Sequence, residues 1–470
     1  MGGQWTASDV LSPATRPGAY FNVIAQAADL LEAGDRGVVL IVGRANWGPV
    51  DETVELLSEA DVTRAYGTGS SLPKLATQAI RGGAATVLGL RIAGSSAAVA
   101  TATLDDEYDV ADALTFEALY PGTRANSFTI TVSDHPVEGL LLDLKESGVL
   151  LERYHTVSGL AEDFAILINA ESAYVVADGS GGGVLAIVTD APFASGNSGT
   201  TVVSGDYTAA QTVAEGEIFD VYVQDDDTNG SNQNAVAAWT ETRREAGQLF
   251  MTVMGGAAAE LVSTAMTRAG DFDFEGVVYV YPGFTDADGV VFTGQEAAAR
   301  VAGHIAAAGF SRSVTFQVLD GVADVETRLG TQDVASALEA GVLLIVADGP
   351  EVRIEKGINT FTSEAEDETK SKAFRKIRTI ATIDAVVEGL ERGFRAYIGA
   401  VTNDDDGRQS MIGAGQEFLD RLVQARALNP GASVALDPSN PPTVDQVFLV
   451  VAITPLDSVE QIFVTVNVAT

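Results

Sequence analysis

The chain has 470 residues, which is too long for one ordinary domain and predicts two to four. Hydrophobic residues make up 46% and charged residues 20% of it, so large cores are expected and global disorder is excluded. Acidic residues number 65 against 28 Lys and Arg, and the resulting net charge of −37 disfavours binding to nucleic acid.

Three sequence features are absent, and each absence bears on the class of protein. No apolar run is long enough to span a membrane, so no membrane partner is expected. Residues 1–18 have neither the basic nor the apolar region of a signal peptide. The chain has no cysteine, which rules out disulfides and thiolate chemistry but says little about the compartment.

The acidity is itself informative. Only six residues are lysine, and a surface with a net charge of −37 repels itself in dilute buffer. At molar salt the Debye length falls to about 3 Å and screens that repulsion. The composition therefore predicts a protein from a salt-loaded cytoplasm, and the alternative is an ordinary acidic mesophilic protein.

Taken in chain order, the first 200 residues predict three segments. Residues 1–22 form a polar, Pro-containing arm that ends in apolar residues. Residues 23–97 form a small α/β domain, in which Val38–Val42 is a buried strand followed by two helices and a second strand. Residues 98–200 contain short strands broken by Gly, Asp and Pro, which predicts a β-sandwich-like insertion.

Residues 201–365 predict a second α/β domain with a largely parallel sheet. Near-continuous apolar strands alternate with helices, which is typical of parallel sheets. The expected strands include the segments "FDVYVQD", "FMTVMGG", "GVVYVYPG", "SVTFQVLDG" and "GVLLIVADG". One helix begins with Thr293 and Glu296, spaced as a capping box.

Residues 366–455 predict an α+β domain that is followed by a terminal arm, 456–470. Two amphipathic helices are expected, the first with Ile380, Val387 and Leu390 on its apolar face. In the terminal strand, Ile462, Val464, Val466 and Val468 point one way and Phe463, Thr465 and Asn467 the other.

No catalytic or cofactor motif is present, so we expect neither enzyme activity nor a cofactor. The sequence has no Walker A loop, no G-x-G-x-x-G where a strand meets a helix, and no G-x-S-x-G nucleophile elbow. The three histidines, His135, His155 and His304, are far apart in sequence and have no metal-ligand spacing. A lone histidine on an Ala-rich helix, such as His304, is usually packed.

Two acidic turns were tested as calcium loops. Asp225–Gly230 matches the first half of an EF-hand loop, but Val236 stands where the bidentate Glu is required, so a bound cation stays an open alternative. Asn403–Arg408 fails the same test. It is interpreted as a turn between two helices whose acidic residues cap the second helix.

A basic cluster is unusual in so acidic a chain. It consists of Lys370, Lys372, Arg375, Lys376 and Arg378, near the start of a predicted helix. The helix dipole disfavours cations there, so we expect an acidic surface opposite. The alternative is a solvated helix end.

Seven segments, in this order, resemble the tail sheath protein of contractile-tailed phages, the type common in phages of Gram-positive bacteria. They are Gly2–Val23, Arg36–Pro49, Tyr120–Ile130, Ser336–Val346, Phe374–Val386, Asn403–Arg408 and Val447–Val468. Each motif is weak alone, but the ordered set is specific and covers nearly the whole chain.

The resemblance implies a structural protein of a virion tail, assembled in the host cytoplasm. It implies stacked hexameric rings around an inner tube, with baseplate and tail terminator proteins as further partners. The α/β part is expected to have a subtilisin-like fold without catalysis. Terminal arms are expected to add strands to neighbouring copies, through Tyr20, Phe21 and Val23 at one end and Ile462, Phe463, Val464, Val466 and Val468 at the other. The basic cluster is expected to face the tube or a neighbouring copy. The acidity departs from the family and indicates a haloarchaeal virus.

Three other hypotheses remain. The same fold occurs in contractile injection systems encoded by cells, and only neighbouring genes separate the two. An inactive α/β hydrolase-like protein is disfavoured because no nucleophile–base pair can be named. A cell-surface lattice protein is disfavoured because residues 1–18 have no signal-peptide pattern.

The net charge of −37 predicts that folding and assembly require high salt. We expect circular dichroism to report loss of structure, and sedimentation to report loss of assemblies, as NaCl falls from molar to millimolar. Unchanged structure and assembly at low salt would contradict the halophilic interpretation.

Overall fold

The computed structural model describes residues 37–108, 112–226, 230–363, 370–460 and 462–465. Two compact units make up these residues. The larger unit contains residues 37–309 and 314–377, and the smaller contains Phe310–Ser313 and the described residues from Arg378 onward. Several sheets and helices in both units confirm the expected mixed α/β and α+β architecture.

An eight-stranded sheet forms the centre of the larger unit, in the order β18-β17-β13-β12-β11-β1-β3-β2. The six inner strands are parallel, and the two edge strands are antiparallel to their neighbours. The strands are β1 (Val38–Arg44), β2 (Thr53–Leu56), β3 (Thr86–Ile92), β11 (Val221–Gln224), β12 (Met251–Gly255), β13 (Val277–Tyr281), β17 (Val342–Asp348) and β18 (Glu351–Ile354).

One pairing joins segments that the sequence presented as two α/β domains. β1 lies parallel to β11, with Val39 opposite Val221 and Ile41 opposite Val223. Residues 37–97 and 201–365 thus contribute strands to one sheet. Both faces of this sheet are covered by helices, which explains why its strands are continuous apolar runs without alternation.

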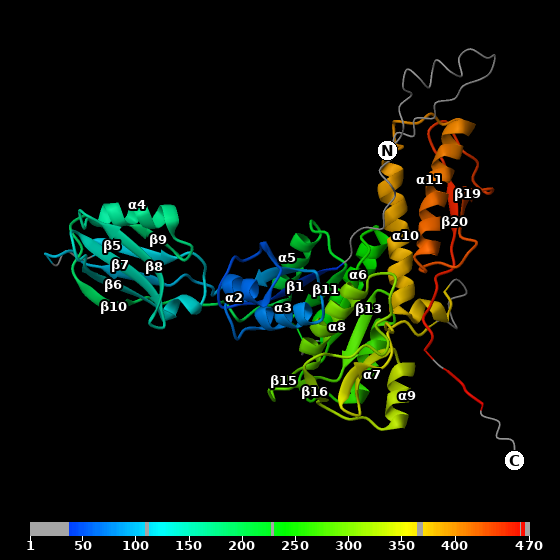
Figure 1. Cartoon of the computed structure of the whole chain (residues 1–470), viewed down its shortest axis with the longest axis horizontal. Coiled ribbons are helices and arrows are strands. Elements are labelled where there is room, and N and C mark those ends of the chain that lie inside the picture. The colour runs from blue at the N-terminus through cyan, green and yellow to red at the C-terminus, as the bar shows by residue number, and fades with distance from the viewer. Residues whose placement is uncertain (1–36, 109–111, 227–229, 364–369, 461, 466–470) are drawn as a thin grey trace, which may run out of the picture. The chain divides into compact units, whose positions relative to one another are not determined.

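Seven helices cover this sheet in the described part of the larger unit (Figure 1). They are α2 (Glu59–Tyr66), α3 (Ser71–Arg81), α5 (Ser204–Ala214), α6 (Gly230–Glu245), α7 (Val262–Phe272), α8 (Gly294–Ala308) and α9 (Thr331–Glu339). The expected capping box of α8 is present: Thr293 Oγ1 accepts from Glu296 N at 3.2 Å, and Thr293 N donates to Glu296 Oε2 at 2.8 Å.

The insertion consists of two antiparallel sheets around a shared apolar core. One sheet contains β4 (Thr101–Leu104), β5 (Leu114–Ala118) and β9 (Val175–Asp178), and the other β6 (Phe128–Asp134), β7 (Leu140–Glu146), β8 (Val149–Thr156) and β10 (Val188–Pro192). The short helix η1 (Arg124–Ser127) precedes β6. Helix α4 (Ala161–Glu171), which the strand pattern did not predict, buries Phe164 and Ile168 in the same core.

One expected strand of the larger unit is wrong. Residues 314–319 form no strand and contribute only an isolated bridge from Val318 to Arg353. Phe316 interrupts the extended backbone because its φ is +63°, a value that bulky residues rarely adopt. A three-stranded sheet of β14 (Phe284–Asp286), β15 (Val291–Phe292) and β16 (Val322–Val325) lies nearby in the chain.

The smaller unit is a helical pair with a β-hairpin beside it. It contains α10 (Ile377–Arg395), α11 (Asp405–Gln424), β19 (Ser433–Leu436) and β20 (Leu449–Ala452). The helices approach closely at Gly389, where an added Cβ would lie 2.3 Å from the Phe418 ring. Val386 and Leu390 are buried in the core that α10 shares with α11. Val387 was expected on the apolar face of this helix. That expectation is wrong, because Val387 is 46% exposed.

His304 on α8 yields a testable pH dependence. Burial, and then the positive charge of Arg300, hold the pKa of His304 at about 4, below its ordinary value of 6.5. The unfolded chain therefore takes up this proton at a higher pH than the folded chain. The free energy of unfolding should fall as the pH is lowered from about 6.5 towards about 4.

His304→Gln should remove that part of the pH dependence, because Gln keeps a polar partner for Gln317 and does not titrate. Denaturant unfolding of both proteins in molar salt, at pH 7.5 and 4.5, measures the difference. Equal pH slopes in the two proteins would contradict the buried neutral imidazole.

Candidate assembly surfaces

The structure brings two of the three histidines together. The rings of His135 and His155, on the insertion, lie 4.1 Å apart between centroids. Their nitrogens contact the backbone of the intervening turn: His135 Nδ1 accepts from Val137 N at 3.3 Å, and His155 Nε2 lies 2.9 Å from Glu138 O. Because these contacts close a turn, we interpret the pair as structural. Among the described residues, no group of three or more His, Asp or Glu is placed to hold a metal ion.

Asp225, the first residue of the candidate cation loop, instead contacts groups of its own chain. Its Oδ2 accepts from Arg44 Nε at 2.7 Å and from Ser71 Oγ, and its Oδ1 accepts from Tyr207 Oη at 2.6 Å. Burial and the adjacent carboxylate raise the pKa of Tyr207, so this hydroxyl stays a donor. Asp225 therefore links β1, α3, α5 and β11. Asp227–Asn229 of the same loop lie outside the described residues.

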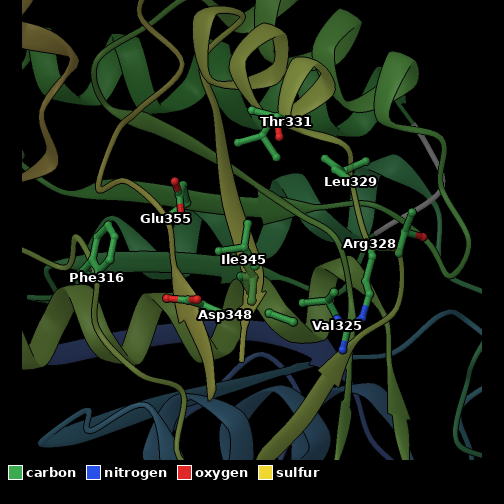
Figure 2. Close-up of a pocket in the computed structure, with 12 residues that line it drawn as sticks. Phe316, Val325, Arg328, Leu329, Thr331, Ile345, Asp348 and Glu355 are labelled. Atoms are coloured by element: carbon green, nitrogen blue, oxygen red, sulfur yellow. The ribbon is translucent and has the colours of Figure 1, made fainter. Parts of the chain in front are cut away.

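A groove of about 510 Å³ lies beside the outer half of β17 (Figure 2). It exists because β17 pairs with β13 only as far as Leu344, whereas its pairing with β18 continues to Asp348. In Figure 2, Asp348 and Glu355 lie with Phe316 on one side of Ile345, and Arg328 lies on the other. The lining contains no His, Ser, Cys or Lys and offers no nucleophile paired with a base.

The basic cluster is held largely by its own chain. Lys370 Nζ lies 2.9 Å from Glu275 Oε1, and Arg375 donates to Leu338 O at 2.8 Å, at the carboxyl end of α9. Arg378, in the smaller unit, donates to Arg426 O at 3.0 Å. The acidic partner of Lys370 in this structure is thus Glu275 of the same chain. The cluster spans the short helix η2 (Lys372–Arg375) and the first turn of α10.

The rest of the cluster lines a pocket of about 340 Å³, here called the basic pocket. Its apolar lining consists of Leu338 and Ile358. Its charged lining consists of Lys356, Lys372, Arg375, Lys376 and the single carboxylate Glu339. Four of the five charged residues in this lining are cationic.

The turn between α10 and α11 has the structure expected for Asn403–Arg408. Asp404 is the N-cap of α11, and its Oδ1 accepts from Gly407 N at 2.8 Å. This backbone donor, and then the Thr402 hydroxyl, lower the pKa of Asp404. The turn is therefore structural, as expected.

The same turn carries an exposed apolar surface, here called the turn knob and defined as Ile398, Val401, Asp404–Asp406 and Val444. Asn403 Nδ2 donates to Thr443 O at 2.7 Å and so holds the loop that carries Val444. Ile398 is 81% exposed and Val444 is 95% exposed. The knob thus combines aliphatic side chains with three carboxylates.

The β19–β20 hairpin forms a sheet of only two strands. One face packs on the helices through Val434, Leu449 and Val451, and the other exposes Val450 by 45%. Two strands alone are marginally stable, and both outer edges carry backbone donors and acceptors that no third strand of the described residues pairs with.

The described part of the C-terminal arm includes three exposed apolar residues, Ile462, Phe463 and Val464. Residues 462–465 form no strand within the chain, although a strand was expected there. Ile462 is 79%, Phe463 91% and Val464 75% exposed. Val466 and Val468 lie outside the described residues, as do Tyr20, Phe21 and Val23 of the N-terminal arm. No helix among the described residues is long and apolar enough to cross a membrane.

Two family models match the chain. The model of the phage tail sheath protein central domain matches residues 200–360, and that of the phage tail sheath C-terminal domain matches residues 369–469. Together they cover more than half of the chain. A Bacillus subtilis protein of the phage-like element PBSX is 26% identical over 96% of this chain and 97% of its own length. The tail sheath protein of Clostridium phage phiCD119 is 25% identical over 32% of this chain and 42% of its own length.

Solved sheath structures have the same fold. The sheath tail protein of Listeria innocua is 25% identical, with a TM-score of 0.69 over 92% of this chain and 94% of that chain. The contracted helical sheath of the anti-feeding prophage is 12% identical, with a TM-score of 0.57 over 96% of this chain and 98% of that chain. With the two domain models in sequence, these matches establish that the chain belongs to the contractile phage tail sheath family.

Proposed function

We propose that this protein is the sheath subunit of a contractile tail, which polymerises around an inner tube and contracts to drive the tube through a cell envelope. The observation that carries the proposal is the pairing of two incomplete features in one chain. No third strand of the described residues pairs with the β19–β20 hairpin, and Ile462, Phe463 and Val464 of the C-terminal arm are apolar and exposed. The hairpin offers unpaired backbone groups and the arm offers a segment that can form a strand. The arm of one copy can therefore pair with the hairpin of another.

Strand donation would provide both affinity and register. Each backbone hydrogen bond between arm and hairpin contributes a net ~0.5–1.5 kcal/mol. Burial of the apolar face of the arm adds roughly 25 cal/mol per Å². Alternating side chains fix the register, since a slip of one residue would turn the apolar row outward. The links are extended chain, so they hold copies together while the rigid units move from one packing to another during contraction.

The finer assembly follows the same proposal. We infer stacked hexameric rings, contacts with tube, baseplate and tail terminator proteins, and a central domain of subtilisin-like fold without catalysis. The virion tail, assembled in the host cytoplasm, is the proposed location. The acidity supports a virus of a salt-loaded, haloarchaeal host. The likeness to the anti-feeding prophage sheath favours, as a second candidate, the sheath of a cell-encoded injection system.

Electron microscopy of the purified protein in molar salt tests the function. Striated tubes are expected. A monodisperse monomer at every salt and protein concentration would contradict a sheath subunit.

Deleting residues 459–470 should give a folded, soluble protein that forms no tubes. Val464→Pro should do the same, because proline removes a ladder donor from the middle of the donated strand. Val464→Thr is the matched control, since it keeps the backbone donor and the β-branched shape and should still assemble. Circular dichroism reports folding and electron microscopy reports tubes.

Sheath of normal length from either the deletion or the proline variant would show that strand donation is not the link. Unfolding of the truncated chain would show that the arm belongs to the core of its own unit.

A further inference from the structure

The register of the β19–β20 hairpin decides which of its backbone groups point outward. In an antiparallel pair, opposite residues alternate between pairs that exchange hydrogen bonds and pairs whose N–H and C=O point away from each other. Asp437 N donates to Phe448 O at 2.9 Å, so this pair is a hydrogen-bonded one. The next pair, Leu436 with Leu449, therefore directs its backbone groups to the two outer edges.

A side chain already occupies the outer edge of β19. The same alternation turns the backbone of Val434 outward, away from β20. Gln416 of α11 meets it there: its Oε1 accepts from Val434 N at 3.3 Å, and its Nε2 donates to Ala432 O at 3.0 Å. A Cβ added at Gly415 would lie 3.1 Å from Val434 Cγ2, so α11 lies directly against this strand. A further strand could pair here only by displacing Gln416.

The outer edge of β20 has no such side chain. The alternation turns the backbones of Leu449 and Val451 outward on this strand. No described residue forms a hydrogen bond with them on that side. The edge therefore offers two N–H and two C=O groups to an added strand.

The solvent faces of the two strands differ as well. On β20 this face carries Phe448 and Val450, which are both apolar and exposed. On β19 it carries the smaller residues Ser433 and Ala435, which are also exposed. An apolar strand would thus gain more buried area beside β20 than beside β19.

We propose that the C-terminal arm of a second copy of this chain adds to the edge of β20, and that Gln416 keeps it off β19. This inference rests on the proposed sheath function and deepens it, because it assigns the donated strand to one edge of the hairpin. It also gives Gln416 a role in assembly, which is to leave each hairpin with one acceptor edge.

The side chains of the arm match this edge. Neighbouring residues on adjacent strands share a face of the sheet. If Ile462 and Val464 continue the face that packs on the helices, Phe463 falls on the solvent face beside Phe448 and Val450. Phe463 is 91% exposed in the single chain, and this contact would cover all three exposed apolar side chains together.

The chain's own arm does not occupy the edge in this structure. Pro455 forms a bridge with Leu428, and Leu456 N donates to Ala427 O at 2.9 Å, so the chain continues past β20 in the same direction. Ile462 follows Leu456 by six positions, and residues 462–465 form no strand. The arm of another copy is therefore the proposed occupant.

Proline at two directly opposed residues tests the edge. Leu449→Pro removes an outward N–H from β20, and Leu436→Pro removes the equivalent N–H from β19 as the matched control. Neither substitution removes a hydrogen bond between the two strands. In molar salt the Leu449 variant should form no tubes by electron microscopy, whereas the Leu436 variant should assemble like the wild type. Circular dichroism verifies that both fold.

Engineered cysteines locate the donated strand even if a proline variant does not fold, since the chain has no cysteine of its own. One chain carries Phe463→Cys, and a second, tagged chain carries Phe448→Cys or Val450→Cys on β20. The matched control is Ala435→Cys, which lies opposite Val450 on β19. Strands lie about 4.8 Å apart, and a disulfide requires Cα atoms within about 7 Å, so only the adjacent strand can be joined.

Mixed chains are assembled in molar salt and oxidised with copper phenanthroline. A disulfide between two chains is expected from one of the β20 cysteines, and none from Ala435→Cys. Adding Gln416→Ala frees the edge of β19, so Ala435→Cys should then be joined as well. Gln424→Ala, an exposed glutamine on the same helix, is the control and should leave the pattern unchanged.

A disulfide from Ala435→Cys with Gln416 in place would put the strand on β19 and overturn the proposal. A disulfide formed only when both cysteines are in one chain would overturn it too, because the arm would then pair with its own hairpin. An unchanged pattern after Gln416→Ala would refute the role of Gln416.

Two further outcomes separate this inference from the proposed function. Tubes that form without any of these disulfides, or normal tubes from a folded Leu449→Pro variant, would refute the β20 edge and leave the sheath function standing. A wild type that forms no tubes at any salt concentration would refute both.

Discussion

Among the described residues, the backbone hydrogen bonding of the β19–β20 hairpin is incomplete, and the proposed assembly depends on this constraint. The β19–β20 hairpin packs on α10 and α11 by one face only, and no third strand of the described residues pairs with it. An exposed two-stranded edge is normally an aggregation hazard that proteins cover or block. Here the chain carries its own apolar segment, beginning at Ile462, that has no place to pack within the described structure. In the proposed function, the edge and the segment together turn this hazard into a directed link between copies.

Electrostatics sets the conditions under which that link can form. A net charge of −37 opposes any close packing of copies unless salt screens it. The few lysines therefore have distinct surroundings. Lys370 is paired with Glu275 and also lies 5.6 Å from the centre of the Phe361 ring, so it stabilises the fold. Lys372 and Lys376 line the basic pocket, together with Lys356 and Arg375.

Periodicity was sufficient where an element is decided by its own residues. Buried strands such as β1 and β17, the capping box at Thr293, and the cap at Asp404 were all predicted, since apolar runs and cap residues act locally. Long-range pairing was not predictable in this way. The parallel contact of β1 with β11 joins segments that are more than a hundred residues apart. No feature of either strand's sequence specifies the strand with which it pairs. Two further errors have specific causes, which are the positive φ of Phe316 and the close helix contact at Gly389.

In the candidate surfaces, too, local features were predictable from sequence and long-range contacts were not. The exposed C-terminal arm and the basic cluster were found from sequence, because apolar alternation and local charge are visible there. Their surroundings were not, since Glu275 lies 95 residues from Lys370 and the knob depends on Asn403 binding a loop near Val444. The stacked pair of His135 and His155 was likewise missed, because a turn brings together residues that no ligand spacing connects.

A cryo-electron microscopy structure of the assembled polymer tests the central claim most directly. The account predicts that residues 462–468 of each copy form a strand that pairs with β19 or β20 of another copy. A polymer in which these residues pair within their own chain, or remain outside every sheet, would contradict it.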